Sequence, residues 1–301
     1  MEPLNRREFA ALAAAPLLAT AASGQRSGES GGMFVSMHGA TSSRSDFRTM
    51  MEGWARAGIR AVEPDLPNVR RFAEQESPAA ARRLLDDLGL RAVSSSNQLF
   101  LEEPGNQRAG SLEDLRWKVE LAEVIGADRL VVPSAARGQY TSPDIYSEVV
   151  DNLREAAEIA RPHNVTLMVE FTRTSTLINN LRTALMVVRR ADHPNLRVMM
   201  DTFHFWSGLS KFEDLEYLED GEIYHLHFED TPMDPPLELF GGGQQNRAFP
   251  GEGIAPLARI VEVLKRKGYN GPASLELFHV GGEDPYEMAV RARETIEPLI
   301  G

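Results

Sequence analysis

The sequence predicts an α/β protein built as a single (β/α)8 TIM barrel. After residue 32, short runs of apolar and β-branched residues alternate with longer segments of helical period, which is the pattern of a parallel sheet with crossover helices. Eight such runs occur, and eight parallel strands close a barrel. The predicted strands cover residues 33–37, 60–65, 91–95, 129–132, 166–171, 197–202, 222–228 and 273–278.

Helices are predicted between these strands. One is expected over 111–125, opened by a capping arrangement of Ser111 and Asp114, and another over 256–267, closed by Gly268. Their period and length fit the outer layer of a barrel.

Residues 33–301 show no break in composition, which predicts one catalytic barrel domain. The least regular stretch, 231–253, is rich in proline and glycine and is expected to be a long loop after the seventh strand. In barrels, loops at this position build the active site.

The N-terminus resembles a twin-arginine export signal. Arg6 and Arg7 precede an apolar run over 10–18 that ends in small residues. We therefore expect a signal peptide over 1–22, a flexible linker over 23–32 and a periplasmic protein. The apolar run is shorter than the roughly 20 residues that span a bilayer, so we expect no membrane anchor after cleavage.

Charge and composition exclude several classes of function. Lys and Arg total 32 against 44 Asp and Glu, a net charge of −12, which disfavours binding to nucleic acid. No cysteine is present, so a metal ion would be held by nitrogen and oxygen atoms.

Four successive strands deliver a group that can bind a metal near their C-terminal ends: Glu170, Asp201, His227 and Glu276. Because side chains alternate across a strand, all four can point into the barrel while the apolar residues between them face the helices. Buried carboxylates in such proximity require a cation. We expect one divalent ion, Mn²⁺ first, with Mg²⁺, Co²⁺ and Zn²⁺ as alternatives.

The chain resembles the xylose-isomerase-like sugar isomerase/epimerase superfamily, and most closely the 2-keto-myo-inositol isomerases. The motifs that carry the resemblance lie at 169–171, 201–205, 227–231, 247–253 and 274–278.

The resemblance implies a role for each site residue. Glu170, Asp201, His227 and Glu276 would bind the metal, the two glutamates would transfer protons as acid and base, and His204 would polarise or protonate a substrate oxygen. A metal that chelates a carbonyl and the neighbouring hydroxyl acidifies the intervening C–H, and reprotonation of the enediolate elsewhere gives an isomer or epimer.

The substrate is expected to be a small, unphosphorylated keto-sugar or keto-cyclitol. Ketohexose 3-epimerases carry a glutamate and an arginine at offsets where this chain has Thr176 and Met233, so a cyclitol or keto-glycoside is favoured. Arg247 is the nearest substitute cation. Further substrate contacts are predicted at Glu63 and His38.

Other functions use the same features. A lyase or dehydratase acting on a keto-cyclitol or 3-keto-glycoside would need the same metal site and the same first proton abstraction. An exported sugar-binding protein without catalysis is a further alternative. The sequence leaves the oligomeric state open.

The leader generates the first prediction. Replacing Arg6 and Arg7 by Lys should leave the protein in the cytoplasm, because the arginine pair is read before the folded chain crosses the membrane. Cell fractionation tests this, and undiminished periplasmic protein from the variant would refute the targeting hypothesis.

Overall fold

The computed structural model describes residues 31–96, 101–105, 107–233, 247–278 and 284–301. The predicted signal peptide (1–22) and nearly all of the predicted linker (23–32) lie outside the described residues, as does 234–246 of the predicted loop.

All eight predicted strands are present in one parallel sheet with the order β3-β2-β1-β8-β7-β6-β5-β4. The two end strands meet through a parallel bridge between Ser95 and Leu130, where Ser95 N donates to Arg129 O and Val131 N donates to Ser95 O, both at 3.0 Å. The sheet thus closes on itself, which confirms the predicted fold class. The strands are β1 (Phe34–His38), β2 (Ala61–Glu63), β3 (Arg91–Ala92), β4 (Arg129–Pro133), β5 (Thr166–Glu170), β6 (Leu196–Asp201), β7 (Ile223–His227) and β8 (Pro272–Leu275).

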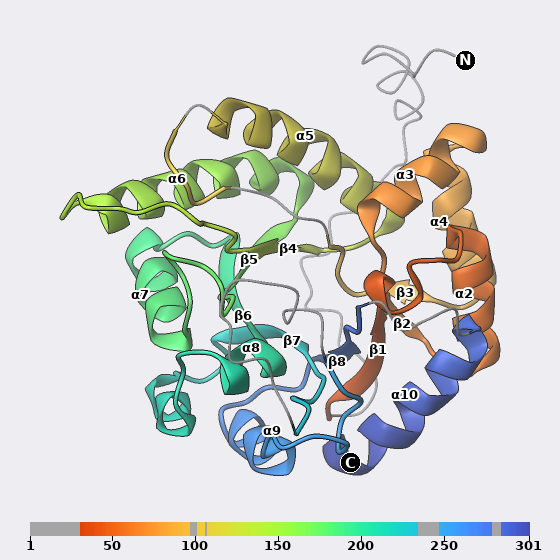
Figure 1. The fold of residues 1–301 in the computed structure, drawn as a ribbon. Coiled ribbons are helices and arrows are strands. Elements are labelled where there is room, and N and C mark those ends of the chain that lie inside the picture. The colour runs from red at the N-terminus through yellow and green to blue at the C-terminus, as the bar shows by residue number, and fades with distance from the viewer. Residues whose placement is uncertain (1–30, 97–100, 106, 234–246, 279–283) are drawn as a thin grey trace.

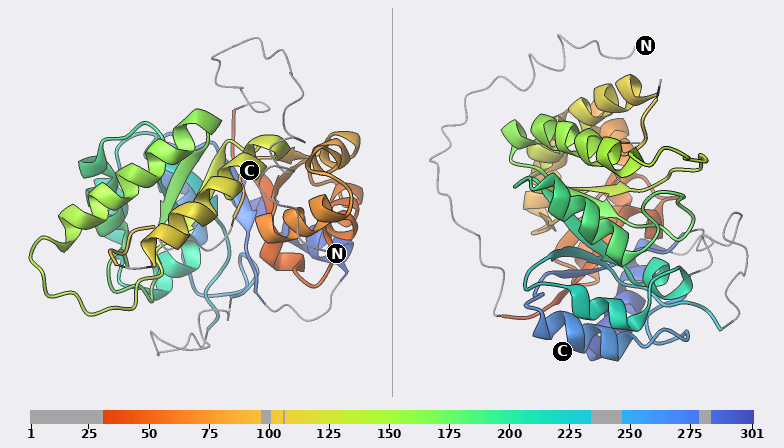
Figure 2. Two further views of the ribbon diagram at one scale, coloured as in Figure 1. Left: turned by 90° about the horizontal axis from the view of Figure 1, so that it is seen from above. Right: turned by 90° about the vertical axis from the view of Figure 1, so that its left-hand side faces the viewer.

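Helices surround the sheet (Figure 1), and the last helix returns to pack against the first described one. Two further views show the same outer layer along the flanks of the barrel (Figure 2). None of the described helices is long and apolar enough to cross a membrane. The helices are α2 (Phe47–Arg56), α3 (Leu66–Gln75), α4 (Pro78–Asp87), α5 (Arg108–Ile125), α6 (Ile145–Ala160), α7 (Leu181–Ala191), α8 (Thr202–Ser207), α9 (Leu257–Arg266) and α10 (Pro285–Ile300), with short 3-10 turns η1 (Gly39–Ser42), η2 (Arg161–His163) and η3 (Phe212–Tyr217).

The predicted start of α5 was wrong. The helix begins one turn earlier, at Arg108, so Ser111 lies inside it and bonds the carbonyl of Gln107 instead of capping the helix. Asp114 contacts the side chains of Trp117 and Lys118 within the same helix. The predicted helix over 256–267 is confirmed as α9.

The two faces of the sheet carry the side chains that strand alternation predicts. Val131, Met168 and Met199 form a small apolar cluster within the barrel, below the strand-end polar groups. The opposite face belongs to the large core between sheet and helices, which includes Val169, Met200, Leu226 and Leu275.

Two local features position the mouth of the barrel. The β6–β7 pairing shifts register between Val198 and Met200, after which Asp201 pairs directly with His227. After β7, Asp230 forms an antiparallel bridge with Ala248, so the segment that begins at Arg247 is held against the end of the strand. A Cβ on Gly253 would lie 2.0 Å from the carbonyl oxygen of Thr231, so only glycine fits there.

Candidate active site

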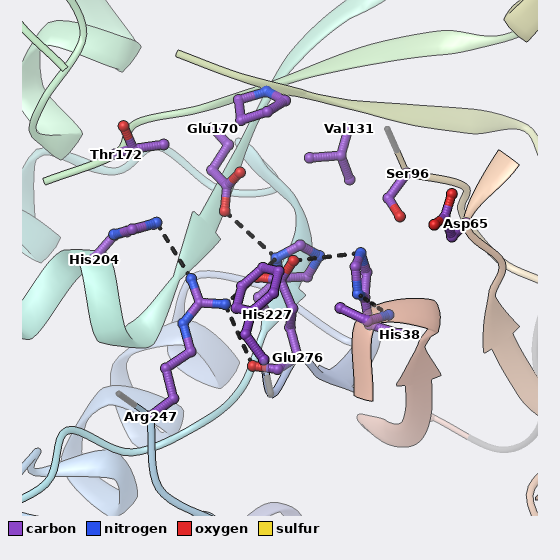
Figure 3. Close-up of a pocket in the computed structure, with 13 residues that line it drawn as sticks. His38, Asp65, Ser96, Val131, Glu170, Thr172, His204, His227, Arg247 and Glu276 are labelled. Atoms are coloured by element: carbon purple, nitrogen blue, oxygen red, sulfur yellow. Dashed lines mark hydrogen bonds and ion pairs between the residues drawn. The ribbon is translucent and has the colours of Figure 1, made fainter. Parts of the chain in front are cut away.

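A cavity of about 340 Å³ opens at the C-terminal ends of the strands (Figure 3). Its size lies at the lower end of the range for small-molecule sites. Polar residues from strands and loops on several sides contribute to its wall, among them His38, Asp65, Glu170, His204, Arg247 and Glu276.

The four predicted metal ligands converge at this cavity. One ligand atom from each of Glu170, Asp201, His227 and Glu276 lies within 4.8 Å of the others, and all four residues are buried. His227 Nδ1 lies 3.4 Å from Glu170 Oε1 and 3.2 Å from Glu276 Oε2. Within the described part of the chain, Nδ1 and Oε1 are buried without a hydrogen bond of good geometry. Buried nitrogen and oxygen atoms without hydrogen-bond partners are suited to act as ligands of a divalent cation.

The position of Glu63 corrects a prediction. It was expected to contact substrate, but its side chain is 0% exposed and lies beneath the cavity among histidines. Its carboxylate contacts His227 Nε2 at 3.2 Å and His225 Nε2 at 2.7 Å, and it accepts a hydrogen bond from Ser274 Oγ at 2.9 Å. Glu63 therefore orients the His227 ring so that Nδ1, and not Nε2, faces the predicted ligands.

The protonation of His227 follows from these contacts. Burial acts to lower its pKa, but the carboxylates of Glu276 and Glu63 outweigh burial and hold the pKa well above its ordinary value. Coordination through Nδ1 would require that nitrogen to lose its proton, while Nε2–H still donates to Glu63.

His38 presents a hydrogen-bond donor to the cavity. Its Nδ1 accepts the backbone N–H of Ala40 at 3.0 Å, which places the ring proton on Nε2. Nε2 lies 3.4 Å from Glu276 Oε1 and 3.8 Å from Glu63 Oε1. His38, predicted as a substrate contact, therefore lines the cavity with a defined tautomer.

His204 follows Asp201 on the first turn of α8. Asp201 Oδ1 accepts the His204 backbone N–H at 2.7 Å as the helix N-cap. Burial lowers the pKa of His204 to about 4, so its ring is neutral at neutral pH. The ring faces the cavity, where a neutral imidazole can hydrogen-bond to a substrate oxygen.

Arg247 lies closer to the predicted metal ligands than the sequence indicated. Its guanidinium contacts Asp201 Oδ2 at 2.6 Å and also pairs with Glu276 Oε2 (Figure 3 shows the Glu276 pair). The side chain is 2% exposed, with its guanidinium carbon 4.7 Å from the centroid of the Phe278 ring. The predicted substrate contact therefore lines the cavity while it neutralises two carboxylates.

Sequence reasoning missed Glu229. This residue is 0% exposed, its carboxyl group lies beside that of Asp201, and no N–H or hydroxyl group of another described residue donates to its oxygens. Burial raises its pKa well above the ordinary value, and the neighbouring charge of Asp201 acts in the same direction. A signal existed, since Glu229 has the inward parity of His225 and His227 on the seventh strand.

The two glutamates proposed for proton transfer differ in their environments. Burial raises the pKa of Glu170 to about 7, with the charge of Glu276 acting in the same direction. Burial also acts to raise the pKa of Glu276, but Arg247, His227 and His38 outweigh it and hold that pKa well below its ordinary value. Two carboxyl groups held in different protonation states suit acid–base chemistry.

The structure is a TIM barrel with a polar cavity at the C-terminal ends of its strands. The chain belongs to the xylose isomerase-like TIM barrel family, whose sequence model matches residues 53–298. This confirms the resemblance given by the motifs, and relatives in the family include isomerases, epimerases and dehydratases.

Two curated relatives and one solved structure illustrate the range. An inosose isomerase of Halalkalibacterium halodurans is 30% identical over 169 residues, or 56% of this chain and 59% of the relative. A 3-dehydroshikimate dehydratase of Pseudomonas aeruginosa is 29% identical over 233 residues, or 77% of this chain and 36% of the relative. The match therefore spans less than two thirds of either relative. A structure described as the IOLI protein with a binding zinc atom superposes with a TM-score of 0.81 at 20% identity, over 89% of this chain and 98% of that one, which shows a shared fold.

The contacts of Glu63 generate a second prediction. Glu63→Gln should lower the affinity for a divalent metal by about 10- to 100-fold, because a neutral amide oxygen accepts the Nε2–H of His227 more weakly than a carboxylate does and raises ligand basicity less. Isothermal titration with Mn²⁺ measures the change. Ser274→Ala is the matched control, since it removes one hydrogen bond to Glu63 but leaves both histidine contacts, and its effect should be smaller. Unchanged metal affinity in Glu63→Gln would contradict the role assigned to Glu63.

Proposed function

We propose that the chain is a metal-dependent isomerase or epimerase that acts on a small, uncharged keto-cyclitol or keto-sugar. The observation that supports this most is the convergence of three carboxylates and one imidazole, all buried, at the wall of a small cavity. The family contains isomerases with which the chain shares sequence along more than half its length. We further propose that the protein acts in the periplasm, on the strength of the twin-arginine pattern.

We propose that Glu170, Asp201, His227 and Glu276 hold one divalent ion. The ligand set is one that Mn²⁺ accepts, and the zinc in the solved structural relative keeps Zn²⁺ among the alternatives. A bound divalent ion supplies Lewis acidity, which polarises a carbonyl and the adjacent hydroxyl and makes the C–H between them more acidic.

The protein side chains then carry out the proton transfers. Glu276, which is ionised, takes the proton from the carbon next to the carbonyl, and Glu170 delivers a proton from the other side of His227. If Glu170 delivers its proton to the former carbonyl carbon, with a hydroxyl proton shifting between the two oxygens, the carbonyl moves by one position. Glu276 then releases its proton to solvent and Glu170 takes one up, which restores both groups. The ring of His204 and the Nε2–H of His38 hydrogen-bond to the substrate oxygens on which charge changes.

The charges around the cavity favour an uncharged substrate. Of the described residues that line it, only Arg247 is a lysine or an arginine, and it is already paired with two carboxylates. The segments 97–100, 234–246 and 279–283, which lie outside the described residues, contain neither Lys nor Arg. Asp65 also lines the cavity, and its Oδ1 is buried without a hydrogen-bond partner in the described structure, which suits a substrate hydroxyl and repels a phosphate or carboxylate.

A dehydratase or lyase is the second candidate. It is favoured by the similarity to 3-dehydroshikimate dehydratase, which covers 77% of this chain. The same proton abstraction would then be followed by loss of water or an aglycone from the neighbouring carbon. The name of that relative indicates a carboxylated substrate, however, for which the described cavity offers no unpaired Arg or Lys.

One experiment separates these candidates. The metal-loaded protein is incubated in D₂O with keto-inositols, ketohexoses, 3-keto-glycosides and 3-dehydroshikimate, and products are followed by NMR. We expect deuterium beside the carbonyl of an uncharged substrate, an isomeric product without loss of water, and no turnover of 3-dehydroshikimate. Chelation should abolish exchange, and added Mn²⁺ should restore it. Exchange that persists in thoroughly metal-stripped protein would contradict the metal-dependent mechanism, and release of water or an aglycone would establish the lyase.

A further prediction separates metal binding from proton transfer. Glu276→Gln keeps a near-isosteric oxygen ligand but loses the base, so turnover should fall by about 10² to 10⁴ while metal content falls much less. His204→Ala should retain its metal and lose kcat, because a substrate oxygen loses its partner. Metal analysis beside kinetics checks both. Wild-type turnover in Glu276→Gln, or metal loss in His204→Ala, would overturn these roles even with the metal site confirmed.

A further inference from the structure

The guanidinium of Arg247 contacts the same oxygen atoms that a metal ion would need. Asp201 Oδ1 is committed to capping α8 through the His204 N–H at 2.7 Å, which leaves Oδ2 for any other cation. Arg247 takes Oδ2 at 2.6 Å. Glu276 divides its oxygens in a similar way, with Oε1 nearest His38 and Oε2 shared by His227 Nδ1 and Arg247. A divalent ion and Arg247 therefore compete for Asp201 Oδ2 and Glu276 Oε2.

The observed position of Arg247 is incompletely satisfied. Its Nε is buried and has no hydrogen-bond partner among the described residues, although Glu229 Oε1 lies 3.8 Å away. The carboxyl group of Glu229 lies beside that of Asp201, and no N–H or hydroxyl group of another described residue donates to its oxygens. Arg247 and Glu229 are thus a buried donor and a buried acceptor separated by little more than a hydrogen bond.

His204 adds a second mismatch. Its Nδ1 lies 3.4 Å from the backbone N–H of Arg173, and its Nε2 lies 3.3 Å from an NH2 group of Arg247. Both neighbours are donors, whereas a neutral imidazole has one lone pair to offer. At one of the two contacts, therefore, an N–H of the ring faces an N–H of its neighbour. Movement of Arg247 away from His204 would remove this unfavourable contact.

We propose that Arg247 is a displaceable internal cation. It bridges Asp201 and Glu276 when no metal is bound, and it shifts to Glu229 when a divalent ion takes those two oxygens. This inference rests on the metal site of the proposed function, and it assigns to Glu229 the role of receiving the displaced guanidinium.

The surrounding structure permits this movement without rearrangement of the backbone. The segment that carries Arg247 is held by the bridge between Asp230 and Ala248, and Asp230 Oδ1 and Oδ2 also accept the N–H groups of Ala255 and Gly251 at 2.9 and 3.0 Å. The change is confined to the side chain. Because the carboxyl group of Glu229 can accept hydrogen bonds from the guanidinium, Arg247 keeps a hydrogen-bond partner in the buried site after a second cation arrives.

The test is a double-mutant cycle on Mn²⁺ affinity, measured by isothermal titration at pH 8 without substrate. Arg247→Lys keeps the positive charge but cannot bridge two carboxylates as a planar fork does. We expect it to bind Mn²⁺ at least about tenfold more tightly than the wild type, the change that corresponds to one lost charge-assisted hydrogen bond. Glu229→Gln should have the opposite effect and weaken binding, and this weakening should largely disappear in the double variant Arg247→Lys/Glu229→Gln.

Thermal unfolding supplies a second measurement. Metal-free Arg247→Lys should melt below the metal-free wild type, while the rise in Tm on adding Mn²⁺ should be larger in the variant. Arg189→Lys is the matched control, since Arg189 makes a two-pronged pair with Glu222 at the opposite end of the barrel, with contacts of 2.6 and 2.7 Å. It should leave Mn²⁺ affinity unchanged.

The outcomes separate this proposal from the metal site itself. A wild-type protein that binds no divalent metal overturns both. If the wild type binds Mn²⁺ but Arg247→Lys binds it no more tightly, competition by bridging is refuted and the metal site stands. If Glu229→Gln weakens binding equally in both backgrounds, Glu229 acts independently of Arg247 and does not receive the displaced guanidinium.

Discussion

The mouth of this barrel depends on the need to keep several buried carboxylates from repelling one another. Glu170, Asp201, Glu229 and Glu276 converge there, and Glu63 lies just below. Removing ionised groups from water is costly, so each must be protonated, paired or bound to a cation. The protein combines all three solutions, with a raised pKa at Glu229 and Glu170, with pairing to Arg247 and the histidines, and with a geometry suited to a divalent ion.

The same constraint explains the local irregularities of the fold. The register shift in β6 sets Asp201 directly beside His227, and the cap of α8 uses one oxygen of Asp201 so that the other is directed to the site. Glu63 reaches across from β2 to a histidine 164 residues later in the chain. Each of these features holds one charged side chain of the cluster in position.

Much of the fold and the ligand set follows from local pattern. Strand alternation is a property of neighbouring residues, so Glu170, Asp201 and His227 could be assigned an inward direction without knowledge of the tertiary structure. The start of α5 could not be predicted from its apparent cap, because the helix continues one turn toward the N-terminus beyond Ser111. The role of Glu63 depends on how closely opposite strands approach within the barrel, which no sequence spacing encodes. Glu229 was overlooked although it has the inward parity, because the predicted strand ended one residue before it.

The eight strands form one continuous ladder, and the barrel closes at a single seam. The residues proposed to bind metal lie at the ends of β5, β6, β7 and β8, away from this seam. Between β3 and β4 the sheet is joined at Ser95 and Leu130, and the cavity residues Ser96 and Val131 stand on either side of that seam. The proposed metal ligands thus lie away from the seam, whereas part of the cavity wall adjoins it. A barrel organised in this way can change the shape of its substrate pocket by substitutions along the seam and keep its reaction intact, a route by which one scaffold diversifies.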